Sequence, residues 1–151
     1  MPILIFTIII SIILDLYTKF LAKINLEETI FLVKDFIYLK YIENPGIAFS
    51  IGITGIFLKL ITIALITGIF IYYFKYEKLK KNKLIDLSFG LILGGAIANR
   101  YERIFNSYVI DFVGIKYFAI FNLADTILTI GVILYLIDSL SFSYLIGESK
   151  K

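Results

Sequence analysis

The chain has 151 residues, of which 60% are hydrophobic, and it contains neither cysteine nor histidine. A soluble globular chain is about 45–50% apolar, so this excess indicates that a lipid bilayer surrounds much of the protein. The two absent residue types exclude disulfides, thiolate nucleophiles, histidine-based triads and the usual zinc sites. The net charge of +3 does not indicate nucleic acid, because five lysines gather in the single run 75–83, which is typical of a loop beside a membrane.

Four apolar stretches are predicted to form transmembrane helices. Each has roughly 18–20 residues, about the number that a helix needs to cross ~30 Å of hydrocarbon. They comprise residues 3–21, 56–74, 84–101 and 121–140. The sequence therefore predicts a mainly α membrane protein, a four-transmembrane-helix bundle that forms a single domain over residues 1–151.

The lysines predict the orientation of this bundle in the membrane. The loop 75–83 and the tail that ends in Lys150 and Lys151 carry the excess of positive charge. Cytoplasmic loops carry such an excess, so the loop, the tail and both termini are expected in the cytoplasm. The outer loops are then residues 22–55 and 102–120.

The first outer loop is not simply polar. Its segment 29–43 is rich in β-branched and aromatic residues, which favour strands. A few short strands are expected there, resting on the outer face of the membrane.

Charged and strongly polar side chains gather at the outward ends of the predicted helices. Such residues are costly inside a membrane and usually have a function. The group comes from three helices and a loop, and comprises Asp15, Lys19, Asn99, Arg100, Glu102, Arg103, Asp111, Asn122 and Asp125. Their convergence at one level of the membrane predicts a functional site.

Asp15 and Lys19 are four residues apart, so they share one helix face. They either form an ion pair that only neutralises itself in the membrane or take part in the site, and in both cases the pair is a support for the site and not its catalytic centre. Gly90, Gly94 and Ala98 recur at the same spacing on the third helix, and such small residues let another helix approach closely.

Gly95, Asn99 and Arg103 form a neighbouring stripe on the third helix, with its polar end at the outer interface. Because a guanidinium is a rigid fork of donors, Arg103 is expected to hold a carboxylate or a substrate carbonyl.

Asp111 and Asp125 are the candidate catalytic pair. Asp111 lies among Val, Ile and Phe in an apolar segment, so desolvation is expected to raise its pKa; the alternative is a solvated loop aspartate. Asp125 follows Asn122 by three residues, which is compatible with helix capping, and a helix N-terminus favours negative charge in its first turn. Two carboxylates that share a proton supply an acid and a base together, without Cys, His or metal.

Five motifs in chain order resemble those of bacterial lipoprotein signal peptidase, also called signal peptidase II. The resemblance covers almost the whole chain. The motifs are Asp15-Leu-Tyr-Thr-Lys19, Asn44-Pro-Gly-Ile-Ala-Phe49, Gly94-Gly-Ala-Ile-Ala-Asn99 followed by Arg103, Val109-Ile-Asp-Phe112, and Phe121-Asn-Leu-Ala-Asp125. Ala98 and Glu102 depart from the Gly and Asp that the family usually has at those positions.

The resemblance implies an aspartyl endopeptidase of the bacterial cytoplasmic membrane with its active site on the extracytoplasmic side. It implies removal of signal peptides from prolipoproteins by cleavage before a diacylglyceryl-modified cysteine, with Asp111 and Asp125 as catalytic residues. The implied substrate-binding and supporting residues are Asp15, Lys19, Asn44, Gly46, Asn99, Arg103 and Asn122. A small extracytoplasmic β-cradle from loop 22–55 is also implied.

The expected partners follow from the same resemblance. They are the diacylglyceryl-prolipoprotein substrate, membrane lipid and globomycin-type peptide inhibitors. No nucleic acid, cofactor or metal is expected, and the chain is expected to be a monomer.

Three other classes of protein stay open from the residues alone. Intramembrane acidic and basic residues also mark proton or ion pathways, although here they gather at one depth. A serine–lysine peptidase would use Lys19 with an outer serine such as Ser50. A non-catalytic membrane scaffold is the third.

Overall fold

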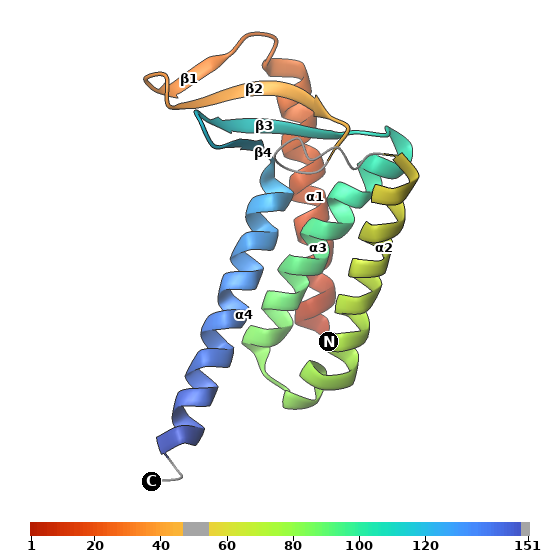
Figure 1. The fold of residues 1–151 in the computed structure, drawn as a ribbon, viewed down its shortest axis with the longest axis vertical. Coiled ribbons are helices and arrows are strands. Elements are labelled where there is room, and N and C mark those ends of the chain that lie inside the picture. The colour runs from red at the N-terminus through yellow and green to blue at the C-terminus, as the bar shows by residue number, and fades with distance from the viewer. Residues whose placement is uncertain (47–54, 149–151) are drawn as a thin grey trace.

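The computed structural model describes residues 1–46 and 55–148, which form a bundle of long helices with one small sheet across its end (Figure 1). In chain order, the long elements are α1 (Pro2–Asn25), β1 (Ile30–Val33), β2 (Ile37–Asn44), α2 (Gly55–Tyr72), α3 (Lys83–Phe105), β3 (Val109–Ile115), β4 (Ala119–Phe121) and α4 (Leu123–Glu148). A π-helical turn, η2 (Tyr73–Glu77), and a 3-10 turn, η3 (Lys78–Lys80), continue α2 toward α3. The predicted mainly helical architecture is confirmed.

Three helices in the described part of the chain are long and apolar enough to cross a membrane, namely Pro2–Asn25, Ile56–Lys80 and Leu123–Ser141. The predicted span 84–101 forms most of α3, which is not among them. α3 can be less apolar than the other helices because it packs mainly against α1 and α4, which protect it from lipid. A helix in that position can carry glycines and charged residues, so the count of four spans stays a prediction.

Small residues bring α1 and α4 close to α3. A Cβ at Gly90 would lie 2.6 Å from the Thr7 side chain, and one at Gly94 would lie 2.6 Å from that of Ser11. The predicted small-residue stripe is therefore a packing face, and its partner is α1. On the adjacent face, a Cβ at Gly95 would lie 2.5 Å from the backbone oxygen of Ala124 in α4.

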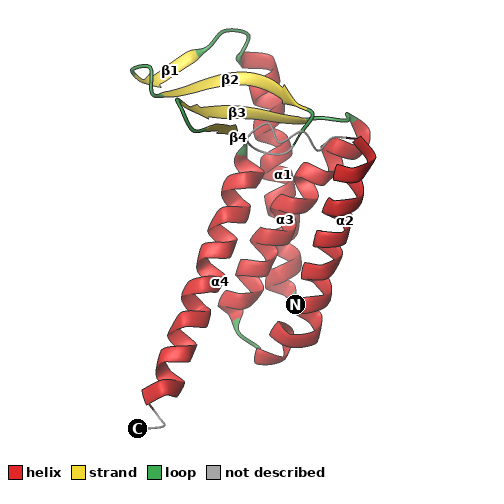
Figure 2. Ribbon diagram, viewed as in Figure 1, coloured by secondary structure: helices red, strands yellow, loops and turns green. Residues whose placement is uncertain are grey.

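The sheet is antiparallel with the order β1-β2-β3-β4 (Figure 2). Strands were expected in residues 22–55, and β1 and β2 lie there, but β3 and β4 come from the second outer loop. Both outer loops therefore build one sheet. The register pairs Ile42 with Asp111 and Asn44 with Val109, which brings the end of β2 beside the start of β3.

The sheet also explains where the predicted helix limits were wrong. The fourth helix was predicted from residue 121, but residues 119–121 pair with β3 as a strand and α4 begins at Leu123. The third helix continues to Phe105, so the start of the predicted loop 102–120 is helical.

Both ends of the described chain lie at the end of the bundle opposite the sheet, together with the connection from α2 to α3 (Figure 1). The lysine-rich run 75–83 is in this connection. This agrees with the expected placement of both termini and the basic loop on one side of a membrane, whose identity as the cytoplasmic side stays a prediction.

The contact between α3 and α4 can be tested at its glycine. Gly95→Ala is expected to lower the free energy of unfolding by about 1–3 kcal/mol, because the new methyl group would overlap backbone. Unfolding of the purified protein in mixed micelles measures the change. Gly68→Ala is the matched control on α2, since nothing lies within 4 Å of its added Cβ; alanine should leave stability unchanged or raise it by up to about 1 kcal/mol. Equal effects of the two substitutions would contradict the close contact.

Candidate active site

Asp111 lies in β3 with a side chain that is 4% exposed. Asn44 Nδ2 donates to its Oδ2 at 2.8 Å, and Asn122 Nδ2 donates to its Oδ1 at 2.7 Å. Burial raises the pKa of the Asp111 carboxyl above its ordinary value, the hydrogen bond from Asn44 opposes the rise, and the nearby Asp125 charge adds to it. The expectation of a desolvated aspartate is confirmed, and the alternative of a solvated loop residue is wrong.

Asp125 lies in the first turn of α4. Its backbone N–H donates to Asn122 Oδ1 at 3.0 Å, and Asn122 N donates to Asp125 Oδ2 at 3.2 Å. This reciprocal pair is a capping box, so the capping role weighed from the sequence is present. Capping leaves Asp125 Oδ1 for another partner, because only Oδ2 takes part in it.

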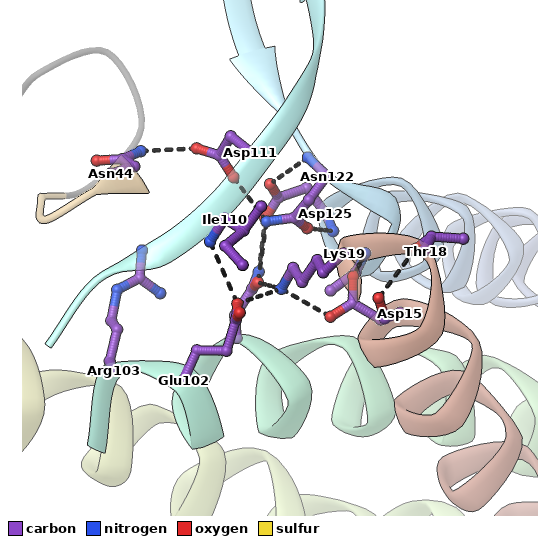
Figure 3. A network of polar contacts seen from close by, with 12 residues as sticks. Asp15, Thr18, Lys19, Asn44, Glu102, Arg103, Ile110, Asp111, Asn122 and Asp125 are labelled. Carbon is purple, nitrogen blue, oxygen red and sulfur yellow. Dashed lines mark hydrogen bonds and ion pairs between the residues drawn. The ribbon is translucent and has the colours of Figure 1, made fainter. Parts of the chain in front are cut away.

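Two asparagines connect the acidic residues. Asn99 Nδ2 donates to Asp125 Oδ1 at 2.8 Å, while Asn99 Oδ1 accepts from Asn122 Nδ2 at 3.0 Å. Asn122 thus contacts Asp111 and Asp125 (Figure 3), and it also contacts Asn99. The two carboxyl groups come from a strand and a helix, and the shared amides hold them in one network.

Lys19 lies beneath this network and is 1% exposed. Its Nζ is 2.7 Å from Asp15 Oδ2, 2.7 Å from Glu102 Oε2 and 2.9 Å from Asn99 Oδ1. The Asp15–Lys19 pair predicted from their spacing is confirmed, and it supports the site instead of only neutralising itself. A lysine enclosed by these groups is not accessible to a serine nucleophile, which weighs against the serine–lysine alternative; Ser50 lies outside the described residues.

The carboxylates around Lys19 also accept hydrogen bonds from backbone N–H groups. Asp15 Oδ1 accepts from Ala124 N at 2.7 Å, and Glu102 Oε2 accepts from Ile110 N at 3.3 Å. Each contact joins a helix to the residue just before a candidate catalytic aspartate. The role of Glu102 was missed from the sequence, although its charge at the level of the site was visible and it lies three residues after Asn99.

Arg103 lies to one side of these connected groups (Figure 3). Its Nη2 donates to the backbone oxygen of Gly46 at 3.0 Å, and Gly46 N in turn donates to Asn44 Oδ1 at 3.0 Å. Its hydrogen-bond partner in the described residues is therefore a carbonyl of the same chain, and the expected carboxylate or substrate partner stays a prediction. The rest of the predicted motif 44–49 lies outside the described residues.

A cavity of about 480 Å³ opens beside the two aspartates. Its polar wall consists of Asn44, Asn99, Arg103, Asp111, Asn122 and Asp125. Its other wall is mostly apolar and comes from the turn before β4, from β4 and from the first turns of α4; the side chains include Phe118, Ile120, Phe121, Leu128 and Ile130. The cavity can therefore accept a molecule that has both a polar and an apolar part.

Every residue predicted for the site except Arg100 lies in this network or on the cavity. The helices form a bundle with apolar outer faces, and the cavity with the two aspartates lies under the sheet. These features define a helical membrane protein with a polar site at one end. A pathway for ions would spread its polar groups across the membrane, whereas these gather beneath the sheet.

The comparisons with known proteins agree with this class. The family model described as signal peptidase (SPase) II matches residues 7–141. The lipoprotein signal peptidase of Halothermothrix orenii is 38% identical over 136 residues, which cover 85% of this chain and 91% of the relative. That of Clostridium novyi is 37% identical over 152 residues, with 95% and 97% covered.

Solved structures resemble the fold as well. A bacterial membrane enzyme determined by the in meso method at 2.3 Å resolution superposes with a TM-score of 0.78 and 26% identity, over 93% of this chain and 88% of the other. A second such structure, at 1.9 Å resolution, has the same TM-score and 27% identity. The chain belongs to the signal peptidase II family, whose members are membrane aspartic endopeptidases that remove signal peptides from prolipoproteins.

Removal of the buried cation tests the base of the site. Lys19→Ala leaves the carboxylates of Asp15 and Glu102 buried without their partner, which is expected to cost about 3–5 kcal/mol of unfolding free energy. Lys23→Ala is the control, since Lys23 is exposed one turn later on α1 and should change stability by less than about 0.5 kcal/mol. Similar losses for the two variants, in the same unfolding assay, would argue against the ion-pair cluster.

The raised pKa of Asp111 predicts a pH dependence of stability. Because the folded protein favours the protonated carboxyl, its contribution to stability is present at low pH and is lost as pH rises through the folded pKa. Asn at this position cannot ionise. The melting temperature of Asp111→Asn minus that of the wild type should therefore become more positive from about pH 4 to about pH 8.

Asp35→Asn provides the baseline for this difference, since Asp35 lies in an exposed turn between β1 and β2. A difference for Asp111→Asn that fell with pH, or followed the Asp35→Asn baseline, would show that the carboxyl is not held in its protonated form.

Proposed function

We propose that the chain cleaves prolipoproteins immediately before a diacylglyceryl-modified cysteine, with Asp111 and Asp125 as a catalytic pair. The observation that carries the proposal is that both carboxyl groups line one cavity and are tied to each other through Asn122. A pair of acidic groups in contact with one cavity can act on the same substrate bond.

The environments of the two groups favour different roles. Burial raises the pKa of Asp111, so Asp111 is assigned as the acid that donates a proton to the scissile carbonyl oxygen. Asp125 lies at the N-terminus of α4, where negative charge is favoured, and it is assigned as the base that takes a proton from the attacking water.

These assignments describe a complete hydrolysis. Water adds to the carbonyl carbon as Asp125 removes its proton and Asp111 protonates the oxygen. The resulting gem-diol collapses when Asp111 takes back a hydroxyl proton, the C–N bond breaks, and Asp125 delivers its proton to the leaving amine. Both side chains end in their starting states, and no nucleophile other than water is needed.

The remaining residues of the site are assigned to support and binding. Asn99 and Asn122 orient the two aspartates, and the Asp15–Lys19 pair holds the base of the site. Asn44, Gly46 and Arg103 lie at the rim and are assigned to the substrate backbone. A globomycin-type inhibitor would occupy the same cavity, since it presents a peptide backbone to the same groups.

The position of the cavity suits a lipid-modified substrate in the bacterial cytoplasmic membrane. It lies at the sheet end of the bundle, opposite the lysine-rich connection, and we assign it to the extracytoplasmic side, with both termini in the cytoplasm. A monomer is sufficient for this reaction, because every proposed residue comes from one chain.

The reaction is tested with the purified protein and a prolipoprotein that carries the diacylglyceryl group. Asp111→Asn and Asp125→Asn are each expected to lower kcat/KM at least about 100-fold, with unfolding still cooperative. Asp35→Asn should retain activity, since Asp35 lies outside the cavity beside the aspartates. The same precursor with an unmodified cysteine should remain uncut.

Two results would refute the proposal. One is full activity in either catalytic variant, which would remove the aspartate mechanism. The other is equal cleavage of modified and unmodified precursors, which would remove the lipid requirement.

A further inference from the structure

A second cavity lies on the other side of Arg103, between the start of α2 and the end of α3. Its volume is about 170 Å³. The described residues that line it are Pro45, Ile56, Leu58, Lys59, Arg103 and Ser107. Arg103 also lines the cavity of the aspartates, so its side chain separates the two spaces.

This second cavity is positively charged. Lys59 and Arg103 are its charged lining residues, and no acidic residue is among those that line it in the described part of the chain. The sequence contains no Asp or Glu between Glu43 and Glu77, so neither the segment before α2 nor α2 itself can supply a carboxylate. The first turn of α2 also lies at the cavity, through Ile56 and Leu58, and the N-terminus of a helix attracts anions.

Arg103 and a second arginine on α3, which is not among the described lining residues of this cavity, have unused donors. Arg100 is one turn before Arg103 on α3, and is 8% exposed. Among the described residues, Nε and Nη1 of Arg100 and Nε of Arg103 are buried without a hydrogen-bond partner. Buried donors without partners are costly and rare, and guanidinium groups match the geometry of phosphate oxygens.

The surroundings identify the source of the anion. The first turn of α2 exposes Ile56 and Phe57, by 63% and 69%, and the last turn of α3 exposes Ile104 and Phe105, by 48% and 69%. These apolar side chains flank a basic pocket at the end of a membrane bundle, which is how a site for a lipid headgroup is built. A free ion would gain nothing from them.

We propose that Lys59, Arg100 and Arg103 bind the phosphodiester of a phospholipid in the same leaflet as the active site, with its acyl chains against the exposed ends of α2 and α3. This site shares Arg103 with the cavity of the aspartates, but Lys59 and Arg100 are not among the described residues that line that cavity, so their binding of lipid does not depend on the proposed reaction. The bound lipid fixes α2 against α3 beside Arg103, which links the lipid to the rim of the active site.

The full chain, stripped of lipid in detergent, tests this proposal by titration with dihexanoyl phosphatidylglycerol, monitored as a rise in melting temperature. Dihexanoylglycerol lacks the phosphate, and inorganic phosphate lacks the acyl chains. Only the phospholipid should bind tightly. Lys59→Gln and Arg100→Gln should each weaken phospholipid binding about tenfold, which is the loss expected for one charge-assisted contact. Arg100→Lys should restore part of the affinity that Arg100→Gln loses.

Lys23→Gln is the control, because Lys23 is an exposed lysine at the same end of the bundle. The proposal is overturned if dihexanoylglycerol binds as well as the phospholipid, since the phosphate would then play no part. It is also overturned if inorganic phosphate binds equally well, or if Lys23→Gln weakens binding as much as Lys59→Gln. Because Lys59→Gln changes a half-exposed side chain, it tests the site even where Arg100→Gln unfolds.

Discussion

The buried ammonium group of Lys19 is the interaction on which the site depends. It lies between the carboxylates of Asp15 and Glu102, and these carboxylates hold the backbone N–H groups of Ala124 and Ile110. One cation therefore joins α1, α3, the start of α4 and β3. A charge buried in this way is costly unless it is fully paired, so these four elements can move relative to one another only by breaking the cluster.

Neutral amides separate this ionic cluster from the acidic pair. Asn99 accepts from Lys19 on one side and donates to Asp125 on the other, and Asn122 continues the chain of hydrogen bonds to Asp111. The positive charge thus polarises the amides instead of pairing directly with the proposed catalytic groups. A direct ion pair would stabilise both aspartates in their ionised form, and a pair that shares a proton needs one of them neutral.

The departures from the family pattern fit this arrangement. Glu102 has a longer side chain than the Asp usual at its position, and its Oε2 still reaches both Lys19 and Ile110 N. Ala98 is fully buried at 0% exposure, so its methyl group is accommodated within the bundle. Gly94 and Gly95 retain the family's glycine pair, and a Cβ at either position would lie within 2.6 Å of a neighbouring helix.

The sequence by itself determined the helices and the level at which the polar groups, Asp111 and Asp125 among them, gather, because hydrophobic length and the cost of charge in a membrane act locally. Only the tertiary structure decided that β3 and β4 complete the sheet, since strand pairing between two loops leaves no local signal. It also decided the roles of Glu102 and Arg103. A carboxylate can bind any donor within reach, and which backbone N–H or carbonyl lies there depends on how α3 packs against its neighbours.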